Sequence, residues 1–238
     1  MSLTGKRIVL LGGSSGIGFS VARQAATQGA SVVIGSSGQE RIDGALKRLP
    51  DDAQGYRVDV TDEDGVRAFF DELGPYDHLV YTAGDALQIK PFEQTDLASA
   101  RQFFEVRYWG AFTAALHGAA TIREGGSIVL SSGSAGARPA KGWMVAASIT
   151  SASEALGRAL AVELAPIRVN VVCPGPTRST LWDGSIAEPE ELYRELGERL
   201  LVGRVGDLDE VASAYVHLME NGFSTGSVLT VDGGHFLS

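Results

Sequence analysis

The chain has 238 residues, 44% of them hydrophobic, which is enough for one α/β domain with a large buried core. Its formal net charge is −9 and its 20 Lys and Arg form no basic run, so the sequence disfavours binding to nucleic acid or to an anionic membrane. The one cysteine, Cys173, excludes an internal disulfide and fits a reducing, cytoplasmic setting, and we expect neither a signal peptide nor a membrane-spanning segment.

Short apolar runs alternate with segments of helical periodicity along the chain. We expect strands over 6–11, 31–35, 55–59, 77–81, 127–131, 168–173 and 227–231. We expect helices over 16–29, 39–49, 62–73, 96–123, 144–165 and 207–221. This alternation predicts an α/β fold, a doubly wound parallel sheet of about seven strands with helices on both faces. We interpret residues 1–238 as a single domain in which about 176–205, rich in Gly, Pro and Glu, form a substrate flap.

The first predicted strand ends in a glycine-rich loop that opens a helix. Gly12 permits a tight turn after the apolar run over 8–11, and Gly16 and Gly18 let the backbone approach a pyrophosphate. The free N–H groups of the first helical turn favour an anion there. A glycine-rich turn without a ligand is the weaker alternative. The phosphate-binding residues that we predict are Gly12, Ser14, Ser15, Gly16, Ile17 and Gly18.

Segments that follow the predicted strands resemble one family across the whole chain. The glycine loop, Asp59-Val60 and Ala83-Gly84 are similar to the cofactor motifs of the short-chain dehydrogenases/reductases. Pro174-Gly175 with Thr177 resembles that family's loop around the nicotinamide amide, and Val231-Asp232-Gly233-Gly234 resembles its C-terminal signature. The resemblance implies a Rossmann-type sheet and a nicotinamide cofactor. The further cofactor contacts that it implies are Asp59, Val60, Ala83, Gly84, Pro174, Gly175 and Thr177.

The end of the second predicted strand bears on which nicotinamide cofactor is bound. An acidic residue there would hydrogen-bond the ribose 2′-hydroxyl and repel a 2′-phosphate. The stretch instead holds Ser36 and Ser37, whose hydroxyls and backbone amides can receive a phosphate. The arginine that the resemblance implies for many NADP-preferring members is missing at Ser37, and Arg41 lies one turn further on. We expect NADP(H) in preference to NAD(H); if both serines are merely loop residues, NAD(H) is the alternative.

The resemblance also implies a catalytic Tyr and Lys, which this chain lacks. Aligned without a gap, their positions fall on Ala146 and Thr150, and with one gap they fall on Val145 and Ile149. In either register the helix expected over 144–165 contains no Tyr and no Lys. The phenol that donates the proton in this family is therefore missing.

Two other side chains are candidates to replace this pair. The family's catalytic Asn position falls on Arg107, and its Ser position falls on Gly133, which Ser132 and Ser134 flank. A permanent guanidinium cation can stabilise a developing alkoxide, and a hydroxyl at a strand end can donate a hydrogen bond to it. We predict Arg107 and Ser132 as the catalytic residues. The alternatives are an arginine at the surface or in an ion pair, and a serine bonded to backbone.

These features predict an atypical NADP(H)-dependent carbonyl reductase with a small-molecule substrate. Hydride would pass from the nicotinamide to a ketone or activated alkene, with the proton supplied by solvent or by a substrate hydroxyl. The alternative is a non-catalytic NADP(H)-binding sensor or scaffold protein. No Cys, His or Asp cluster has metal-ligand spacing, so we expect no metal. Small residues on the helices expected over 96–123 and 144–165 suit helix pairing between subunits, and the resemblance implies a homodimer or homotetramer.

Overall fold

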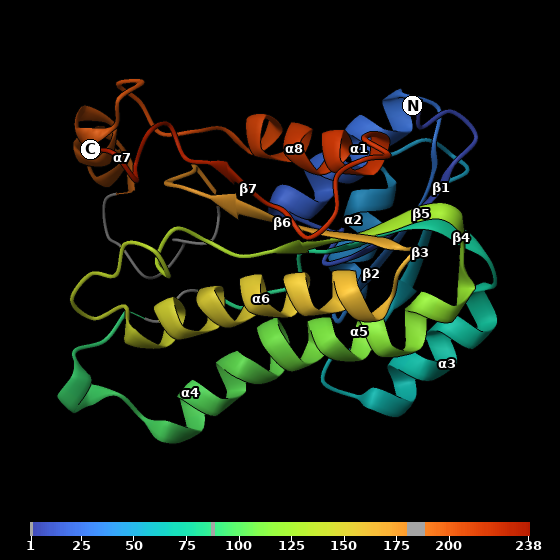
Figure 1. The fold of residues 1–238 in the computed structure, drawn as a ribbon, viewed down its shortest axis with the longest axis horizontal. Helices are drawn as coiled ribbons and strands as arrows, with labels where there is room; N and C mark the ends of the chain where they lie inside the picture. Colours follow the sequence, from blue (N-terminus) through green and yellow to red (C-terminus); the bar gives the residue numbers. More distant parts are fainter. Residues whose placement is uncertain (1, 87–88, 180–188) are drawn as a thin grey trace.

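The computed structural model describes residues 2–86, 89–179 and 189–238. Its strands form a parallel sheet in the order β3-β2-β1-β4-β5-β6-β7 (Figure 1). The strands are β1 (Arg7–Leu11), β2 (Ser31–Ser36), β3 (Gln54–Arg57), β4 (Tyr76–Tyr81), β5 (Ile122–Ser131), β6 (Arg168–Pro174) and β7 (Val228–Val231). Each strand overlaps a run expected from the sequence, and the doubly wound α/β fold is confirmed.

Helices cover both faces of this sheet (Figure 1). One face carries α1 (Gly16–Thr27), α2 (Gln39–Leu46) and α8 (Leu208–Glu220). The other face carries α3 (Glu63–Leu73), α5 (Gly110–Gly118) and α6 (Met144–Glu163), with α4 (Leu97–Phe104) leading into α5. The helix α7 (Pro189–Arg199) lies at the same end of the molecule as the C-terminus (Figure 1).

The central strand β1 shows why the predicted strands are apolar without interruption. Its side chains alternate, so that Ile8 and Leu10 enter the core under α1 and α8 while Val9 and Leu11 enter the core over α3 and α5. All four are fully buried. A strand covered on both faces has no solvent side, and the hydrophobic effect therefore selects an apolar residue at every position.

The helix expected over 96–123 is corrected by the structure in two ways. It is interrupted by a π-helical turn, η2 (Glu105–Trp109), between α4 and α5. It also ends with a short 3₁₀ turn, η3 (Ala119–Thr121), because β5 already begins at Ile122. The Tyr81 hydroxyl donates a hydrogen bond to the Val106 carbonyl oxygen inside the π turn. The Tyr81 hydroxyl thus competes with a helical N–H group for this carbonyl oxygen, which is consistent with the wider π turn. Such π turns are common at functional sites.

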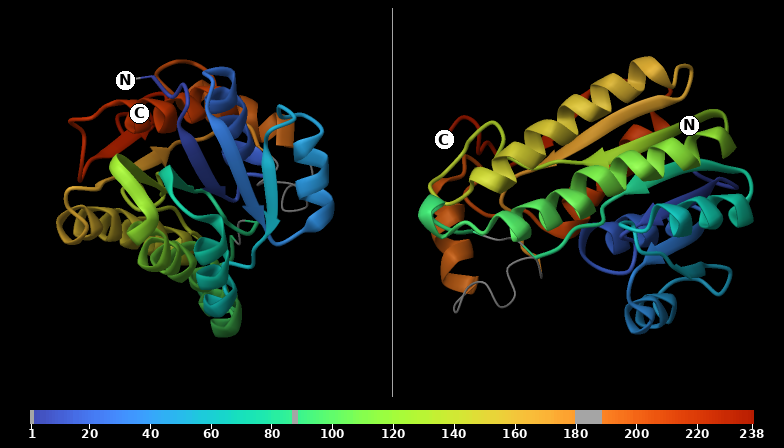
Figure 2. Two further views of the ribbon diagram at one scale, coloured as in Figure 1. Left: turned by 90° about the vertical axis from the view of Figure 1, so that its right-hand side faces the viewer. Right: turned by 90° about the horizontal axis from the view of Figure 1, so that it is seen from below.

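The carboxyl ends of the strands gather at one edge of the sheet (Figure 2). The loop after β1 is held against the segment after β4, where Thr82 N donates to the Leu11 carbonyl oxygen (2.8 Å). Ligands of doubly wound sheets bind beyond this edge. Among the described residues, no helix is long and apolar enough to cross a bilayer.

Candidate active site

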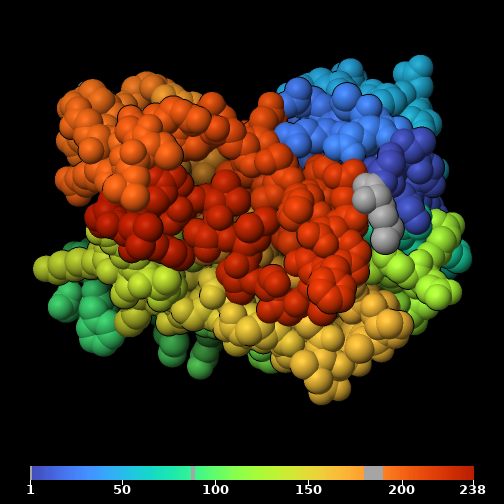
Figure 3. Space-filling view, turned by 45° about the horizontal axis from the view of Figure 1, so that its top comes forward, coloured from blue at the N-terminus to red at the C-terminus, as the bar shows by residue number. Residues whose placement is uncertain are grey.

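A cavity of about 920 Å³ runs along the carboxyl ends of the strands. Its walls come from the segments after β1 to β6, the start of α6, the end of α7 and the C-terminal tail. Figure 3 shows the surface hollowed between the orange region around α7 and the blue N-terminal region. Every residue predicted for the site lines this cavity: Gly12, Ser14, Ser15, Gly16, Ile17, Gly18, Ser36, Ser37, Asp59, Val60, Ala83, Gly84, Arg107, Ser132, Pro174, Gly175 and Thr177.

The loop after β1 fits the diphosphate of a dinucleotide. Gly12 has a φ of +92°, and a Cβ placed on it would lie 2.4 Å from the backbone nitrogen of Ala83. A Cβ on Gly18 would lie 2.3 Å from the Gly12 carbonyl oxygen. Both positions therefore require glycine. Among the described residues, no side chain caps the first turn of α1 and no acid lies in it, so its N–H groups can receive an anion.

Two guanidinium groups converge on Ser37 at the end of β2. Arg41 Nη2 donates a hydrogen bond to Ser37 Oγ (3.1 Å), and Arg57 Nε donates to the Ser37 carbonyl oxygen (3.3 Å). Arg41 lines the cavity together with Ser36 and Ser37. Arg41 therefore reaches Ser37 although it lies one helical turn further along the chain. Arg41 and Arg57 supply positive charge beside position 37, where the sequence itself has a serine and not an arginine.

Asp59 lines the cavity just beyond β3. Its Oδ1 accepts hydrogen bonds from Thr61 N (3.0 Å) and Thr61 Oγ1 (2.7 Å). These two bonds hold the pKa of the Asp59 carboxyl below its usual value. An ionised acceptor fixed in this way suits the amino group of an adenine ring.

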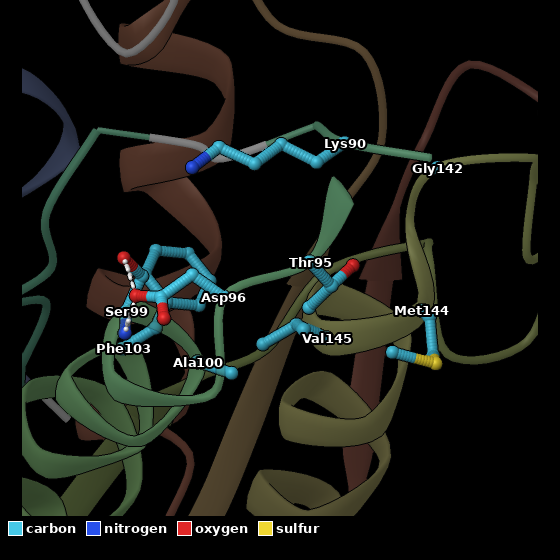
Figure 4. Close-up of a pocket in the computed structure, with 9 residues that line it drawn as sticks. All are labelled: Lys90, Thr95, Asp96, Ser99, Ala100, Phe103, Gly142, Met144 and Val145. Atoms are coloured by element: carbon cyan, nitrogen blue, oxygen red, sulfur yellow. Dashed lines mark hydrogen bonds between the residues drawn. The ribbon is translucent and has the colours of Figure 1, made fainter. Parts of the chain in front are cut away.

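The first turns of α6 decide the register of the missing catalytic pair. Ala146 and Thr150 line the cavity. Val145 instead points into a separate small pocket with Thr95 and Ala100 (Figure 4), and Ile149 does not line the cavity but is buried against Phe103. The alignment without a gap therefore matches the geometry. Where the family's Tyr and Lys would face the cavity, this chain presents a methyl group and a hydroxyl, and the described lining contains no Tyr or Lys.

Arg107 enters the cavity from the middle of the π turn. Its Nη2 donates to the Asp85 carbonyl oxygen, and its guanidinium carbon lies 4.6 Å from the centroid of the Phe103 ring. Its Nε is buried without a hydrogen-bond partner in the described part of the chain. Burial lowers the pKa of Arg107 and the Asp85 charge opposes that shift. Because an arginine keeps its proton at neutral pH, the group stays a cation facing the cavity.

Ser132 lies at the end of β5, with its hydroxyl between the cavity and α6. Ser132 Oγ donates to Glu154 Oε1 (3.1 Å), and Ser132 N donates to the Val172 carbonyl oxygen (2.8 Å). Donation to a substrate oxygen would therefore replace the bond to Glu154. The neighbouring Cys173 is buried at the end of β6, as expected for a small strand residue, and burial raises the pKa of its thiol to about 11.

Three side chains that the sequence analysis did not name reach the same cavity. Arg138 follows β5, Arg199 ends α7, and His235 lies in the C-terminal tail. Arg138 Nη1 donates to the His235 carbonyl oxygen and to Ser238 Oγ (3.3 Å), which ties the tail to the segment before α6. Burial, and then the Arg138 charge, lower the pKa of His235. No spacing in the sequence indicates this convergence, because the three residues come from distant segments.

Part of the predicted flap over 176–205 falls on 180–188, outside the described residues. Of the remainder, Thr177 forms a parallel bridge with Gly206, and Tyr193 of α7 and Leu200 just after it pack with Trp143. The flap's described ends are thus anchored to the wall of the cavity.

Comparisons with known proteins identify the family. A family model described as enoyl-(acyl carrier protein) reductase matches residues 12–235. The short-chain dehydrogenase/reductase ATR9 of Stachybotrys chlorohalonatus is 35% identical over 99% of both chains. A crystal structure of a small-chain dehydrogenase in complex with NADPH is 33% identical, with a TM-score of 0.86 over 98% of this chain and 100% of that one.

A second solved structure is the MalC reductase/Diels-Alderase from Malbranchea aurantiaca. It is 28% identical and has a TM-score of 0.92, and the match covers 99% of this chain and 98% of that one. These matches span the whole sheet and the cavity at its carboxyl edge. The chain belongs to the short-chain dehydrogenase/reductase family of oxidoreductases.

Proposed function

We propose that this protein is an atypical NADP(H)-dependent carbonyl reductase, which transfers hydride between the nicotinamide and a small organic carbonyl compound or alcohol. One observation carries the proposal: a cavity that fits a dinucleotide continues, without a Tyr or Lys in its described lining, to the buried cation Arg107. The similarity to a small-chain dehydrogenase solved with NADPH and to the MalC reductase/Diels-Alderase supports this proposal.

The preference for NADP(H) rests on the positive charge at the end of β2. Arg41 and Arg57 both bond to Ser37, and no acidic side chain lines the cavity at 35–37 to repel a 2′-phosphate. A guanidinium group binds a phosphate through paired, charge-assisted hydrogen bonds. Arg41 and Ser37 would therefore hold the phosphate that distinguishes NADP(H) from NAD(H).

When bound, the reduced cofactor supplies the hydride. Arg107 stabilises the negative charge that develops on the carbonyl oxygen, because a fixed cation in a site shielded from water acts most strongly on charge that appears during the reaction. Ser132 donates a second hydrogen bond once its hydroxyl turns from Glu154. Arg107 cannot release its own proton, so the proton comes from water or from a substrate hydroxyl.

The test is NADPH oxidation by the purified protein with a panel of ketones, aldehydes and activated alkenes. We expect turnover, and we expect Arg107→Ala to lower kcat/KM about 10²–10³-fold, the usual effect of removing one oxyanion partner. The dissociation constant for NADPH should stay the same. The matched control is Arg158→Ala, on the exposed side of α6 away from the cavity. Turnover that survives Arg107→Ala would contradict the assigned role.

A second candidate function follows from the same lining. Without the family's Tyr and Lys, the protein would bind NADP(H) as a sensor or scaffold and transfer no hydride. NADPH would then raise the melting temperature by mass action, with no turnover on any member of the panel. Hydride transfer at an enzyme-like rate excludes this alternative.

The proposal includes a cytoplasmic location, supported by the single buried thiol, and assembly into a homodimer or homotetramer. Support for assembly comes from an exposed apolar stripe on the helix that runs through η2 and α5. Trp109, Phe112 and Leu116 are 49%, 36% and 58% exposed, and their spacing places them on one helical face. Contiguous apolar surface of this kind marks sites of protein association.

A further inference from the structure

We propose that the substrate carries an acidic group, a carboxylate or a phosphate, and that Arg138 and Arg199 receive it. The inference rests on the proposed function, since it concerns the substrate of that same cavity. We use the name substrate end for the part of the cavity lined by Arg107, Arg138, Arg199 and His235. These residues follow or precede β5, β6 and β7, on the far side of β1 from the residues after β2 and β3.

Positive charge is concentrated at the substrate end although the whole chain carries a net charge of −9. The described lining of the cavity contains two carboxyl side chains, Asp59 and Asp85, and only Asp85 follows a strand on this side. Asp85 meets Arg107 through its backbone carbonyl oxygen. In the described lining of the substrate end, three guanidinium groups stand against one carboxyl side chain, in a molecule that is otherwise acidic.

The arginines of the substrate end differ from most of the chain's other exposed arginines in having no carboxylate partner. Over residues 2–86, 89–179 and 189–238, ion pairs occupy Arg23, Arg67, Arg123, Arg178, Arg194 and Arg204. None of those pairs includes Arg107, Arg138 or Arg199. Three guanidinium groups that face one cavity, with no ion-pair partner among the described residues, form a site suited to an anion.

Arg138 and Arg199 approach the cavity from two different walls. Arg138 is oriented by its Nη1, which donates to the tail at the His235 carbonyl oxygen and Ser238 Oγ. Arg199 ends α7, which lies at the same end of the molecule as the C-terminus (Figure 1) but apart from it (Figure 2). Both side chains are exposed, and the hydrogen bonds of Arg138 to the tail use only its Nη1, which leaves its Nη2 and the Arg199 guanidinium to donate to a ligand.

The cofactor does not account for this charge. Its diphosphate fits the N-terminus of α1, where backbone N–H groups are the donors. A 2′-phosphate fits Arg41 and Ser37 at the opposite end of the sheet. The remaining anion must belong to the substrate. Arg107 then faces the reacting carbonyl, while Arg138 and Arg199 bind the acidic group at the other end of the same molecule.

The experiment measures binding rather than turnover, with the protein saturated with NADP⁺. The probes are 4-acetylbenzoate, its methyl ester and 4-acetylphenyl phosphate, which share one ketone and differ in charge. By titration calorimetry we expect the better of the two anions to bind at least about tenfold more tightly than the ester, with a preference that shrinks as salt is added. Whether the carboxylate or the phosphate binds more tightly identifies the acidic group. Equal affinity for ester and anions overturns the proposal.

Variants assign the charge to residues. We expect Arg138→Gln and Arg199→Gln each to weaken anion binding about three- to tenfold and to leave ester binding unchanged. Arg158→Gln, an exposed arginine of α6 that does not line the cavity, is the control and should change neither. An anion preference that persists in the double variant Arg138→Gln/Arg199→Gln overturns the assignment. An unchanged NADP⁺-induced rise in melting temperature verifies that the variants fold.

The binding experiment, together with an assay of NADPH oxidation on the same three probes, separates this inference from the proposed function. An anion preference without NADPH oxidation on any substrate would retain the charged site and refute the reductase. Oxidation of NADPH with the ester as readily as with the acids would retain the reductase and refute the charged site.

Discussion

Single residues at the end of β2 carry the proposed preference for NADP(H). Ser37 is the point of contact, because its hydroxyl and its carbonyl oxygen each accept a hydrogen bond from a different arginine. The first bond comes from Arg41 on α2, and the second comes from Arg57 at the end of β3. The sequence alone indicated the serines and the absence of an acid. It could not indicate Arg57, because the pairing of β2 with β3 brings that residue beside the loop.

Replacing Arg41 tests this arrangement. We expect Arg41→Ala to weaken NADPH binding about 10- to 100-fold, since a charge-assisted contact to phosphate is lost, and to change NADH binding little. Fluorescence titration with both cofactors measures the ratio. Lys47→Ala, which removes a positive charge at the end of the same helix without touching the cavity, is the control. Equal losses for NADPH and NADH would show that Arg41 merely supports the loop.

The sequence indicated the glycine loop of the cavity but not Arg138 and Arg199 of the substrate end. Glycines such as Gly12 and Gly18 are required by the backbone path itself, so their spacing in the sequence carries the information. Arg138 and Arg199 have no such local requirement. Their role depends on where α7 and the C-terminal tail come to rest, which is a property of tertiary packing. The catalytic roles of Arg107 and Ser132 stay predictions until they are measured.

At the level of elements, the junction of β4 and β5 gives the fold a sensitivity to acid. His78 is buried on β4, and its Nδ1 lies 2.8 Å from Ser127 Oγ on β5. Burial, and then the charge of Arg168, lower its pKa from 6.5 to about 4. The unfolded chain therefore binds this proton more strongly than the folded one between those two values. The contribution of His78 to the free energy of unfolding is complete above its pKa in the unfolded chain. It is lost as the pH falls toward its pKa in the folded protein.

We expect the free energy of unfolding to fall by about 2 kcal/mol from about pH 7 to about pH 5 on account of His78. Urea titrations at the two pH values measure the difference. His78→Gln should remove most of this pH dependence even though it lowers stability overall. His217→Gln, at an exposed position of α8, should keep the wild-type dependence. A wild-type protein with equal stability at both pH values would contradict the assignment.

Two helical glycines make a matched pair for testing how tightly the helices pack on the sheet. A Cβ on Gly157 of α6 would lie 2.2 Å from Val171 Cγ2 on β6, whereas a Cβ on Gly44 of α2 meets nothing within 4 Å. We expect Gly157→Ala to destabilise the protein by about 1–3 kcal/mol through overpacking. We expect Gly44→Ala to stabilise it by about 0.5–1 kcal/mol through helix propensity. Urea denaturation of the two variants measures the change in the free energy of unfolding. A change of the same sign in both variants would refute the prediction.

The elements themselves were largely predictable from the sequence, for a physical reason. A parallel strand covered on both faces, such as β1, is apolar at every position, and a helix such as α3 shows its buried stripe at Val66, Phe69, Phe70 and Leu73. The helix expected over 96–123 was the main error. Its π turn arises where Tyr81 on β4 bonds to the Val106 carbonyl oxygen, a contact between elements that no local pattern contains.

At the level of the whole molecule, the exposed stripe of Trp109, Phe112 and Leu116 predicts a self-association surface. We expect the wild-type protein to sediment as a dimer or tetramer and Leu116→Glu to shift it toward the monomer, because a buried charge without a partner opposes association. Leu201→Glu, at another exposed leucine, should leave the assembly state unchanged. A wild-type protein that sediments only as a monomer would refute the proposed assembly.

The π turn at Glu105–Trp109 has a consequence for how such a cavity can change over evolution. A residue in a helix is displaced by about 100° around the axis when one residue is inserted or deleted before it. A single-codon deletion ahead of Arg107 would thus swing its guanidinium out of the cavity, while the glycine loop and the arginines beside Ser37, on other elements, would stay where they are. Within one fold, the placement of Arg107 can therefore change without a change in the residues proposed to bind the cofactor.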